Sequence, residues 1–338
     1  MSPGFRVFAV ALLSAGSALA QTVPSSGAPS MADARALMTQ GKLDDALGEL
    51  NSLAAQQPRL AGVERLRGIV LYEKNQLQEA QDSFAQAVER DPTDLESMQM
   101  RGVALYRLGR PAEAIPLLEK AHTSGPVENA DPRYVLALCY ITTKRYDDAR
   151  HAFAALYGFA PDSAAAWLVT ARMLFRQEHT ADAAAAARKA VQIDERIPLA
   201  HRLLGEIALA GGDTAGALSE FAQEIKVNPL DGETYDRMGD AHLRSGDYRE
   251  AQQALDRAVL LEPNATGPYI LLGKTLLAEH DAVTAAMYLE RAVKMDPSNA
   301  MGHMLLGRAL SESGRKADAA REFQALQKLQ AAPAASNP

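Results

Sequence analysis

Small residues recur along the chain with a period of 34 positions, and apolar residues recur with them. One position of the period is always alanine: Ala46, Ala80, Ala114, Ala149, Ala183, Ala217, Ala251, Ala285 and Ala319. Twelve positions earlier stands a second small residue: Ala34, Gly68, Gly102, Ala137, Ala171, Gly205, Gly239, Gly273 and Gly307. Every step is 34 residues except the step of 35 from Ala114 to Ala149. Nine matches in register exclude chance, so we predict an array of nine repeated units.

Within each period the pattern predicts two antiparallel helices. Four residues after the repeated alanine comes a larger position that is apolar in most units: Leu50, Phe84, Leu118, Phe153, Ala187, Phe221, Leu255, Leu289 and Phe323. Glycine recurs at the tight turn between the helices, where a positive φ is often needed: Gly41, Gly109, Gly212, Gly246 and Gly314. We expect the small residues to let two helices approach closely, and the larger side chains to fill the groove between one hairpin and the next.

The period is clearest over residues 232–265, which read GETYDRMGDAHLRSGDYREAQQALDRAVLLEPNA. This stretch is close to the pattern W-x₂-L-G-x₂-Y…A-x₃-F…P through Tyr235, Met238, Gly239, His242, Ala251, Leu255 and Pro263. The chain therefore resembles the tetratricopeptide repeat family. The resemblance implies an all-α fold, an α-solenoid coiled as a right-handed superhelix of about nine helix hairpins. In this family the first helix of each hairpin lines the concave wall, and the motif identifies a fold and not a ligand.

The repeats divide the chain into a solenoid at 31–330, a Pro/Gly/Ser-rich linker at 21–30 and a disordered tail at 331–338. The units fall near residues 27–60, 61–94, 95–129, 130–163, 164–197, 198–231, 232–265, 266–299 and 300–331. Unit five has Glu195 where most units close with proline, and its alanine-rich second helix offers little surface to bury. The single inserted residue lies in His122–Pro132. We therefore expect the weakest seams of the stack around units four and five.

The first 20 residues have the features of a cleaved secretory signal peptide. Arg6 supplies the positive charge, Val7–Leu13 is an unbroken apolar run, and Ala18-Leu19-Ala20 is a cleavage signature. The alternative is a retained membrane anchor, but the apolar run is well short of the roughly 20 residues that span a bilayer. Residue 21 is glutamine, which leaves no cysteine there for a lipid anchor. We predict an exported protein, periplasmic or secreted, without an integral membrane span after cleavage.

Composition and motifs argue against nucleic-acid binding and catalysis. The formal charge is −7, and loss of Arg6 with the leader makes it −8, from 34 basic and 42 acidic residues. This balance disfavours nucleic acid as a partner. The sequence contains no nucleophile elbow, zinc-protease motif or phosphate loop, and no two of its seven histidines are spaced as a helical metal pair. We expect Cys139 to be an inert core thiol. The repeats leave no room for a catalytic domain, so we predict no enzyme activity, no cofactor and no metal.

Function is then expected on the concave wall. One inward position carries a ladder of mostly apolar residues, one per unit: Met38, Tyr72, Tyr106, Ile141, Phe175, Leu209, Leu243, Leu277 and Ser311. The predicted groove residues are Arg65, Tyr72, Gln99, Tyr106, Arg107, Tyr134, Arg172, Phe175, Arg176 and Arg202. Units six and seven are more acidic, with Glu206, Glu233, Asp236 and Asp240 beside Arg244. The alternative is that the ladder packs against neighbouring helices and that the charges are only a solvated face.

Our hypothesis is a non-catalytic scaffold or adaptor that binds a peptide segment or partner helix in this groove. Aromatic rungs would supply buried area, and arginines would bind carboxylates or carbonyls. Assembly of an envelope complex fits the predicted export. A periplasmic subunit of a polysaccharide synthesis or export apparatus, where similar arrays occur, is the alternative. The Lys/Asn set with which some tetratricopeptide domains grip a chaperone tail is not found here. The partner's identity and the oligomeric state are left open by the sequence.

Overall fold

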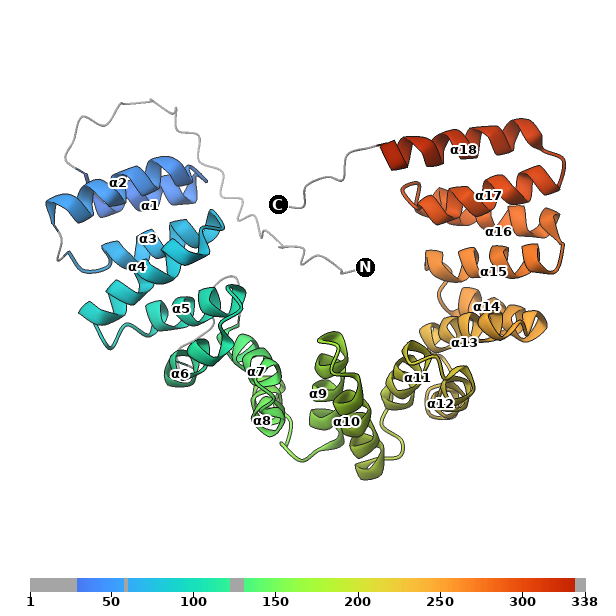
Figure 1. Ribbon diagram of the computed structural model, residues 1–338, viewed down its shortest axis with the longest axis horizontal. Helices are drawn as coiled ribbons and strands as arrows, with labels where there is room; N and C mark the ends of the chain where they lie inside the picture. Colours follow the sequence, from blue (N-terminus) through green and yellow to red (C-terminus); the bar gives the residue numbers. More distant parts are fainter. Residues whose placement is uncertain (1–28, 58–59, 122–130, 332–338) are drawn as a thin grey trace, which may run out of the picture.

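The structure is a computed structural model that describes residues 29–57, 60–121 and 131–331. These residues form eighteen helices that pair into nine hairpins (Figure 1). The first helices of the hairpins are α1 (Met31–Thr39), α3 (Val63–Glu73), α5 (Leu95–Arg107), α7 (Pro132–Thr142), α9 (Ala164–Arg176), α11 (Ala200–Ala210), α13 (Gly232–Ser245), α15 (Thr266–Ala278) and α17 (Ala300–Glu312). The second helices are α2 (Leu43–Gln56), α4 (Leu77–Arg90), α6 (Pro111–Ala121), α8 (Tyr146–Tyr157), α10 (Thr180–Ile193), α12 (Thr214–Val227), α14 (Tyr248–Leu261), α16 (Ala282–Met295) and α18 (Lys316–Ala331).

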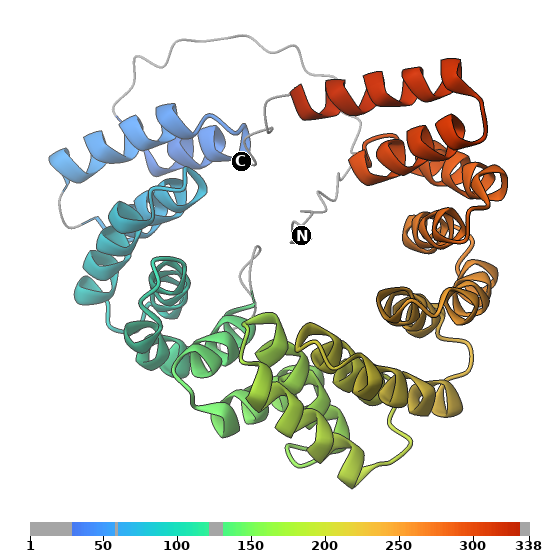
Figure 2. The same ribbon diagram turned by 45° about the vertical axis from the view of Figure 1, so that its right-hand side comes forward.

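The hairpins stack side by side into one curved array, which confirms the predicted all-α solenoid. Successive first helices contact each other along the array, from α3–α5 to α15–α17, whereas no contact of similar extent joins successive second helices in the described part. The first helices therefore lie on the shorter, inner arc. Figures 1 and 2 show the same curvature, with the first and last hairpins facing each other across an opening.

Close approach within each hairpin depends on the small residue of its first helix. A Cβ atom added at Gly205 would lie 2.4 Å from the ring of Phe221, and one at Gly239 would lie 2.4 Å from Leu255. Phe221 and Leu255 are fully buried. The larger apolar side chain thus packs over the glycine of its own hairpin. It is not confined to the space between hairpins, as the sequence alone had suggested.

The turn inside every hairpin contains one residue in the left-handed backbone conformation. Glycine occupies this position in five hairpins, as predicted, and the other four hairpins use Asn75, Lys144, Glu178 and His280 with φ between 60° and 64°. These nine residues keep the register of the repeat. The turn geometry is therefore imposed by helix packing even where the residue type disfavours it.

Replacing Lys144 by glycine should raise the free energy of unfolding by about 0.5–1 kcal/mol, because glycine adopts positive φ without steric cost. The gain is limited by the larger entropy that glycine gives the unfolded chain. Lys144 is exposed, so little else changes. Urea denaturation measures the difference. The matched control is Gly246→Ala at the equivalent turn, which should destabilise by a similar amount, and equal stabilities for both variants would contradict the explanation.

The buried core is continuous around units four and five, although the contact between α8 and α9 is the least extensive of those that join consecutive hairpins. The expectation of weak seams in this part of the stack therefore stays a prediction. The largest apolar cluster runs from Val103 to Ile207, and so passes from α5 through α11 without a break. The small side chains of α10 remain buried in this cluster because α9 and α11 supply the bulk. A break occurs later, because one cluster ends at Ala241 in α13 and the next begins at Leu276 in α15.

Amide hydrogen exchange should therefore be faster in α13 than in α7. Helix α13 buries only two apolar side chains, Ala241 and Leu243, whereas α7 buries most of its length. Local opening costs less free energy where less apolar surface is buried. Exchange followed by mass spectrometry at peptide resolution tests this comparison within one sample. Slower exchange in α13 than in α7 would show that the core clusters do not govern local stability.

Several sequence predictions fall outside the described residues. These are the signal peptide at 1–20, most of the linker at 21–30, segment 122–130 with the inserted residue, and the tail from 332 onward. They stay predictions. Among the helices that the structure does describe, none is both long enough and apolar enough to cross a membrane.

Candidate functional site on the concave wall

The apolar ladder of the concave wall is partly buried between first helices. Ile141, Leu209, Leu243 and Leu277 are buried and serve packing. The aromatic rungs Tyr72, Tyr106 and Phe175 pack on the core but keep part of their rings at the surface. Apolar surface for a ligand therefore comes from units two, three and five, and the packing alternative holds for much of the ladder.

Tyr134 joins these rungs from α7, where its ring lies edge-on to Phe153 at 6.0 Å between centroids. Its hydroxyl group donates to the sulfur of Met173 at 3.4 Å. Tyr106 lies close by, and burial raises the pKa of its phenol, with neighbouring Cys139 and Tyr134 adding to the shift. Both tyrosines act as packing surfaces with a polar edge.

Two of the predicted groove residues are engaged inside the protein. The side chain of Gln99 is 1% exposed, and its Nε2 donates to the carbonyl oxygen of Ala121 at 2.8 Å. The buried guanidinium of Arg202 pairs with Asp231 at 3.0 Å and with Glu233 at 2.8 Å. The Gln99 contact lies within its own hairpin and the Arg202 contacts join one unit to the next, so neither side chain is available to a ligand in this conformation.

Arg65 and Arg107 are at the surface but already have partners. Arg65 pairs with Asp94 and Glu96, each at 3.1 Å. Arg107 donates to the side-chain oxygen of Asn75 at 2.6 Å and lies over the ring of Tyr72 at 4.9 Å. A ligand carboxylate would have to compete with these contacts at Arg65, and less so at Arg107, whose partners are neutral.

Arg172 and Arg176 differ from the other predicted arginines. They lie one turn apart on α9, on either side of Phe175, and neither forms an ion pair with any residue that the structure describes. Arg176 is exposed and Arg172 is half-buried. Arg172 is near enough to Glu206 for its charge to lower the pKa of that carboxyl, against the larger effect of burial. The two side chains thus present positive charge without an ion-pair partner next to an aromatic surface.

The wall turns acidic immediately beyond, but most of its carboxylates are paired. Glu206 and Glu233 share Arg202 and Arg237 at 2.8–3.8 Å. Burial raises the pKa of Glu206, and the nearby Arg202 and Arg237 oppose this effect. The internal pairs leave these two side chains nearly neutralised.

Asp236 on α13 is the exception among these acids. Its Oδ1 is buried and has no hydrogen-bond partner among the described residues. Burial raises the pKa of Asp236 to about 6, Arg237 opposes this, and Asp240 and Glu233 add to it. The sequence indicated the acidic character of unit seven but not the unpartnered carboxyl of Asp236. Burial of that side chain depends on tertiary packing, which no local sequence pattern contains.

At the end of the array the wall becomes apolar again. Met301 and Met304 on α17 are 53% and 41% exposed, at the positions equivalent to Glu233 and Asp236. Sequence reasoning missed them because it followed the ladder position alone. The 34-residue register would have found them.

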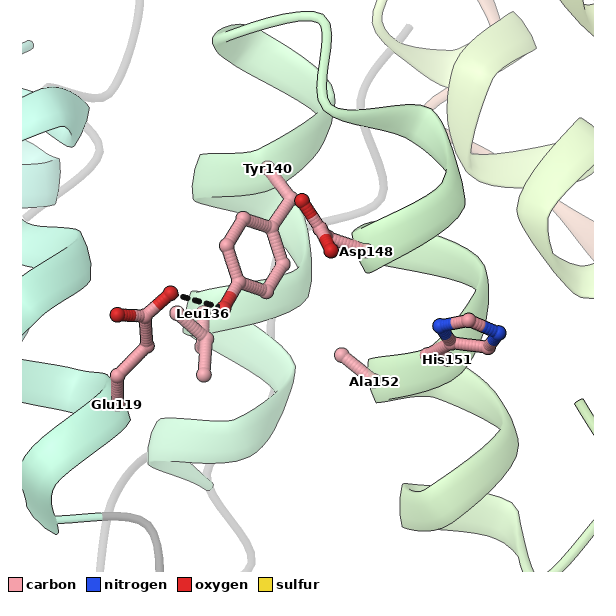
Figure 3. A pocket seen from close by; sticks show the side chains of 6 residues that line it. All are labelled: Glu119, Leu136, Tyr140, Asp148, His151 and Ala152. Atoms are coloured by element: carbon pink, nitrogen blue, oxygen red, sulfur yellow. Dashed lines mark hydrogen bonds between the residues drawn. The ribbon is translucent and has the colours of Figure 1, made fainter.

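A small hollow of about 230 Å³ lies among α6, α7 and α8 (Figure 3). It is lined by Glu119, Leu136, Tyr140, Asp148, His151 and Ala152. The hydroxyl group of Tyr140 donates to Glu119 at 2.6 Å. Arg145 stacks on Tyr140 and pairs with both Glu119 and Asp148. The acidic charge of the hollow is thus compensated within the protein.

The thiol and two histidines have structural surroundings. Cys139 is fully buried, and burial raises the pKa of its thiol to about 12, so it stays protonated and unreactive at neutral pH. His201 and His303 each bind a glutamate of the same hairpin at 2.7 Å. In the part of the chain described, no cluster of His, Cys, Asp and Glu could hold a metal ion.

Comparison with known families supports what the hairpins indicate. Three models described as tetratricopeptide repeat match the chain, one over residues 105–173, one over 31–94, 65–129 and 270–336, and one over 232–265. The chain belongs to the tetratricopeptide repeat family. No curated protein sequence matches it.

Solved structures similar to this tetratricopeptide protein include MamA, Cut9 and YrrB. MamA from Desulfovibrio magneticus RS-1 is 20% identical with a TM-score of 0.48, covering 52% of this chain and 98% of MamA. Cut9, in the APC/C hetero-tetramer Cut9–Hcn1, is 19% identical with a TM-score of 0.45, covering 82% and 54%. YrrB, described as a TPR protein with an unusual peptide-binding site, is 19% identical with a TM-score of 0.45, covering 50% and 87%. At these values the similarity concerns the repeat fold alone.

Proposed function

We propose that the protein is a non-catalytic scaffold that binds a peptide segment of a partner protein on its concave wall, centred on α9. The observation that carries the proposal is the pair Arg172 and Arg176, which has no ion-pair partner in the described residues and flanks the half-exposed ring of Phe175. Apolar area beside uncompensated guanidinium groups suits a segment with a carboxylate and an apolar side chain.

The fold supports this function in a general way. A curved array of hairpins offers an extended inner surface on which side chains from several repeats meet one ligand. The family is one of interaction scaffolds. We place the scaffold in the cell envelope or outside the cell, in complex assembly, on the strength of the predicted signal peptide.

Reversing the charge of both arginines should reduce retention of the partner about tenfold or more, because two attractive contacts become repulsive. The test is affinity capture from envelope extracts with the native chain and with Arg172→Glu/Arg176→Glu, quantified by mass spectrometry. The matched control is Arg188→Glu/Lys189→Glu, which makes the same change of charge on exposed residues of α10 in the same hairpin.

Only the α9 variant should lose partners, and the same partners should remain on the control. Equal capture by all three proteins would contradict binding at α9. Equal loss from both variants would show that net charge, and not the concave wall, governs the interaction.

A further inference from the structure

The concave wall carries, at two separate places, charges of opposite sign that form no ion pair among the described residues. Positive charge lies on α9, at Arg172 and Arg176. Negative charge lies on α13, at Asp236, whose buried Oδ1 lacks a hydrogen-bond partner in the described residues. Helix α11 lies between them and contacts both (Figure 1). Its Glu206 is compensated by Arg202 and Arg237.

The separation of these charges can be converted into a length of peptide. Packed helices lie about 8–10 Å apart, so the two steps from α9 to α13 span roughly 16–20 Å. On α9, Arg172 lies one helical turn beyond the position equivalent to Asp236. This offset adds about 5 Å along the helix axis, at a right angle to the line that leads from α9 to α13. An extended chain advances about 3.3 Å per residue, so about six residues connect the two places.

We propose that the bound segment is an extended peptide that carries an Asp or Glu side chain on Arg172 and Arg176 and, about six residues away, a Lys or Arg side chain on Asp236. The inference rests on the proposed function and specifies the chemistry of its partner. The residues between the two charges pass over α11 and require no charge of their own, because Glu206 and Arg202 are already paired.

The contacts at both ends of the peptide follow from ordinary pairing rules. Two guanidinium groups one turn apart can donate together to one carboxylate, which gives a strong charge-assisted contact. At the other end, an ammonium or guanidinium group would pair with the Asp236 carboxylate through its other oxygen, because Oδ1 itself is closed to solvent. The carboxyl that burial leaves unsatisfied thus gains a partner only when the peptide is bound. Side chains facing Asp236 are Glu233, Arg237, Asp240 and Glu262.

The spacing separates an extended occupant from a helical one. A partner helix advances only about 1.5 Å per residue, so its two charges would lie roughly twelve residues apart over the same span. The number of residues between the two charges of the ligand therefore distinguishes an extended peptide from a helix. We commit to the extended form, and the spacing of the two charges in selected peptides tests it.

The experiment is selection of a random 16-residue display library on the purified full chain, followed by sequencing of enriched peptides. We expect enrichment of peptides with one acidic and one basic residue at a spacing of five to seven. Selection on Arg172→Glu/Arg176→Glu should remove the acidic preference and keep the basic one. Selection on Asp236→Asn should remove the basic preference and keep the acidic one. The control Arg188→Glu/Lys189→Glu should leave both preferences unchanged.

A second measurement needs no protein variant. Fluorescence anisotropy of one enriched peptide should show about tenfold weaker binding to the native chain when its acidic residue becomes Gln, and likewise for its basic residue. Enriched peptides without the charge pair, with a spacing near twelve, or with binding indifferent to both substitutions would overturn this inference and leave the scaffold function intact. Absence of any enriched peptide would count against the proposed function itself.

Discussion

Replacing Gly205 by alanine should lower the free energy of unfolding by about 1–3 kcal/mol. A helix normally gains about 1 kcal/mol when alanine replaces glycine in its interior, so the expected sign is opposite to the usual one. The reason is overpacking, because the new Cβ atom would lie 2.4–2.9 Å from three ring atoms of Phe221. That ring is fully buried, so it cannot turn out to solvent. Equilibrium urea denaturation measures the effect.

Two other glycines provide matched controls for this prediction. Gly307 meets Phe323 in the same geometry at 2.6 Å, but Phe323 is 43% exposed and can turn away. Gly307→Ala should therefore be close to neutral. Gly48 has no atom within 4 Å of an added Cβ, so Gly48→Ala should stabilise the protein. Equal effects at Gly205 and Gly307 would show that ring burial does not decide the cost.

Replacing Asp236 by asparagine should raise the free energy of unfolding at pH 7–8 by about 1–3 kcal/mol. The carboxyl is charged at this pH, but burial and the neighbouring acids raise its pKa in the folded protein to about 6, above the 3.8 of the ordinary group. Ionised Asp236 therefore opposes folding. Asparagine keeps the shape of the side chain and removes the charge.

The gain should depend on pH in a defined direction. Above pH 6 the native carboxylate carries its full penalty, and the penalty fades as pH falls from 6 to 4, because the folded state takes up the proton first. The advantage of Asp236→Asn should accordingly vanish near pH 4. Denaturation of both proteins at pH 8, 6 and 4 tests this. Asp240→Asn is the control on the same helix, and it should lack the gain because Asp240 pairs with Arg244 at 2.7 Å.

This result would also bear on function. A side chain that costs stability in the free protein and lies on the wall of the groove is typical of a site kept for binding. If Asp236→Asn stabilises the chain and abolishes the basic preference of bound peptides, both effects have one cause. A variant that is neutral at every pH would show that Asp236 is solvated in solution.

Sequence alone could place the ten groove residues on first helices, because a fixed period puts each position on a known helix face. It could not tell which side chains remain free. Gln99 is held by a carbonyl oxygen 22 residues away, and Arg202 by a carboxylate 29 residues away. The first contact depends on how the two helices of one hairpin pack, and the second on how one hairpin sits against the next. Among the predicted arginines, only Arg172 and Arg176 form no such contact.

The expectation of weak seams around units four and five stays a prediction, but one of its reasons does not hold. The alanine-rich α10 was judged by its own side chains, whereas burial depends on what its neighbours contribute, and α9 and α11 contribute enough to keep the core continuous. The surface methionines of α17 and the uncompensated carboxyl of Asp236 are also products of packing.

By itself, the sequence determined the number of hairpins, their register and the positions where two helices touch. This was possible because a repeat packs only on its neighbours and similar residue types recur at the same positions of each period. Tertiary structure decided which charges are paired and which remain uncompensated. Desolvation and ion pairing act between side chains from different repeats, and their strength depends on distances that no local pattern contains.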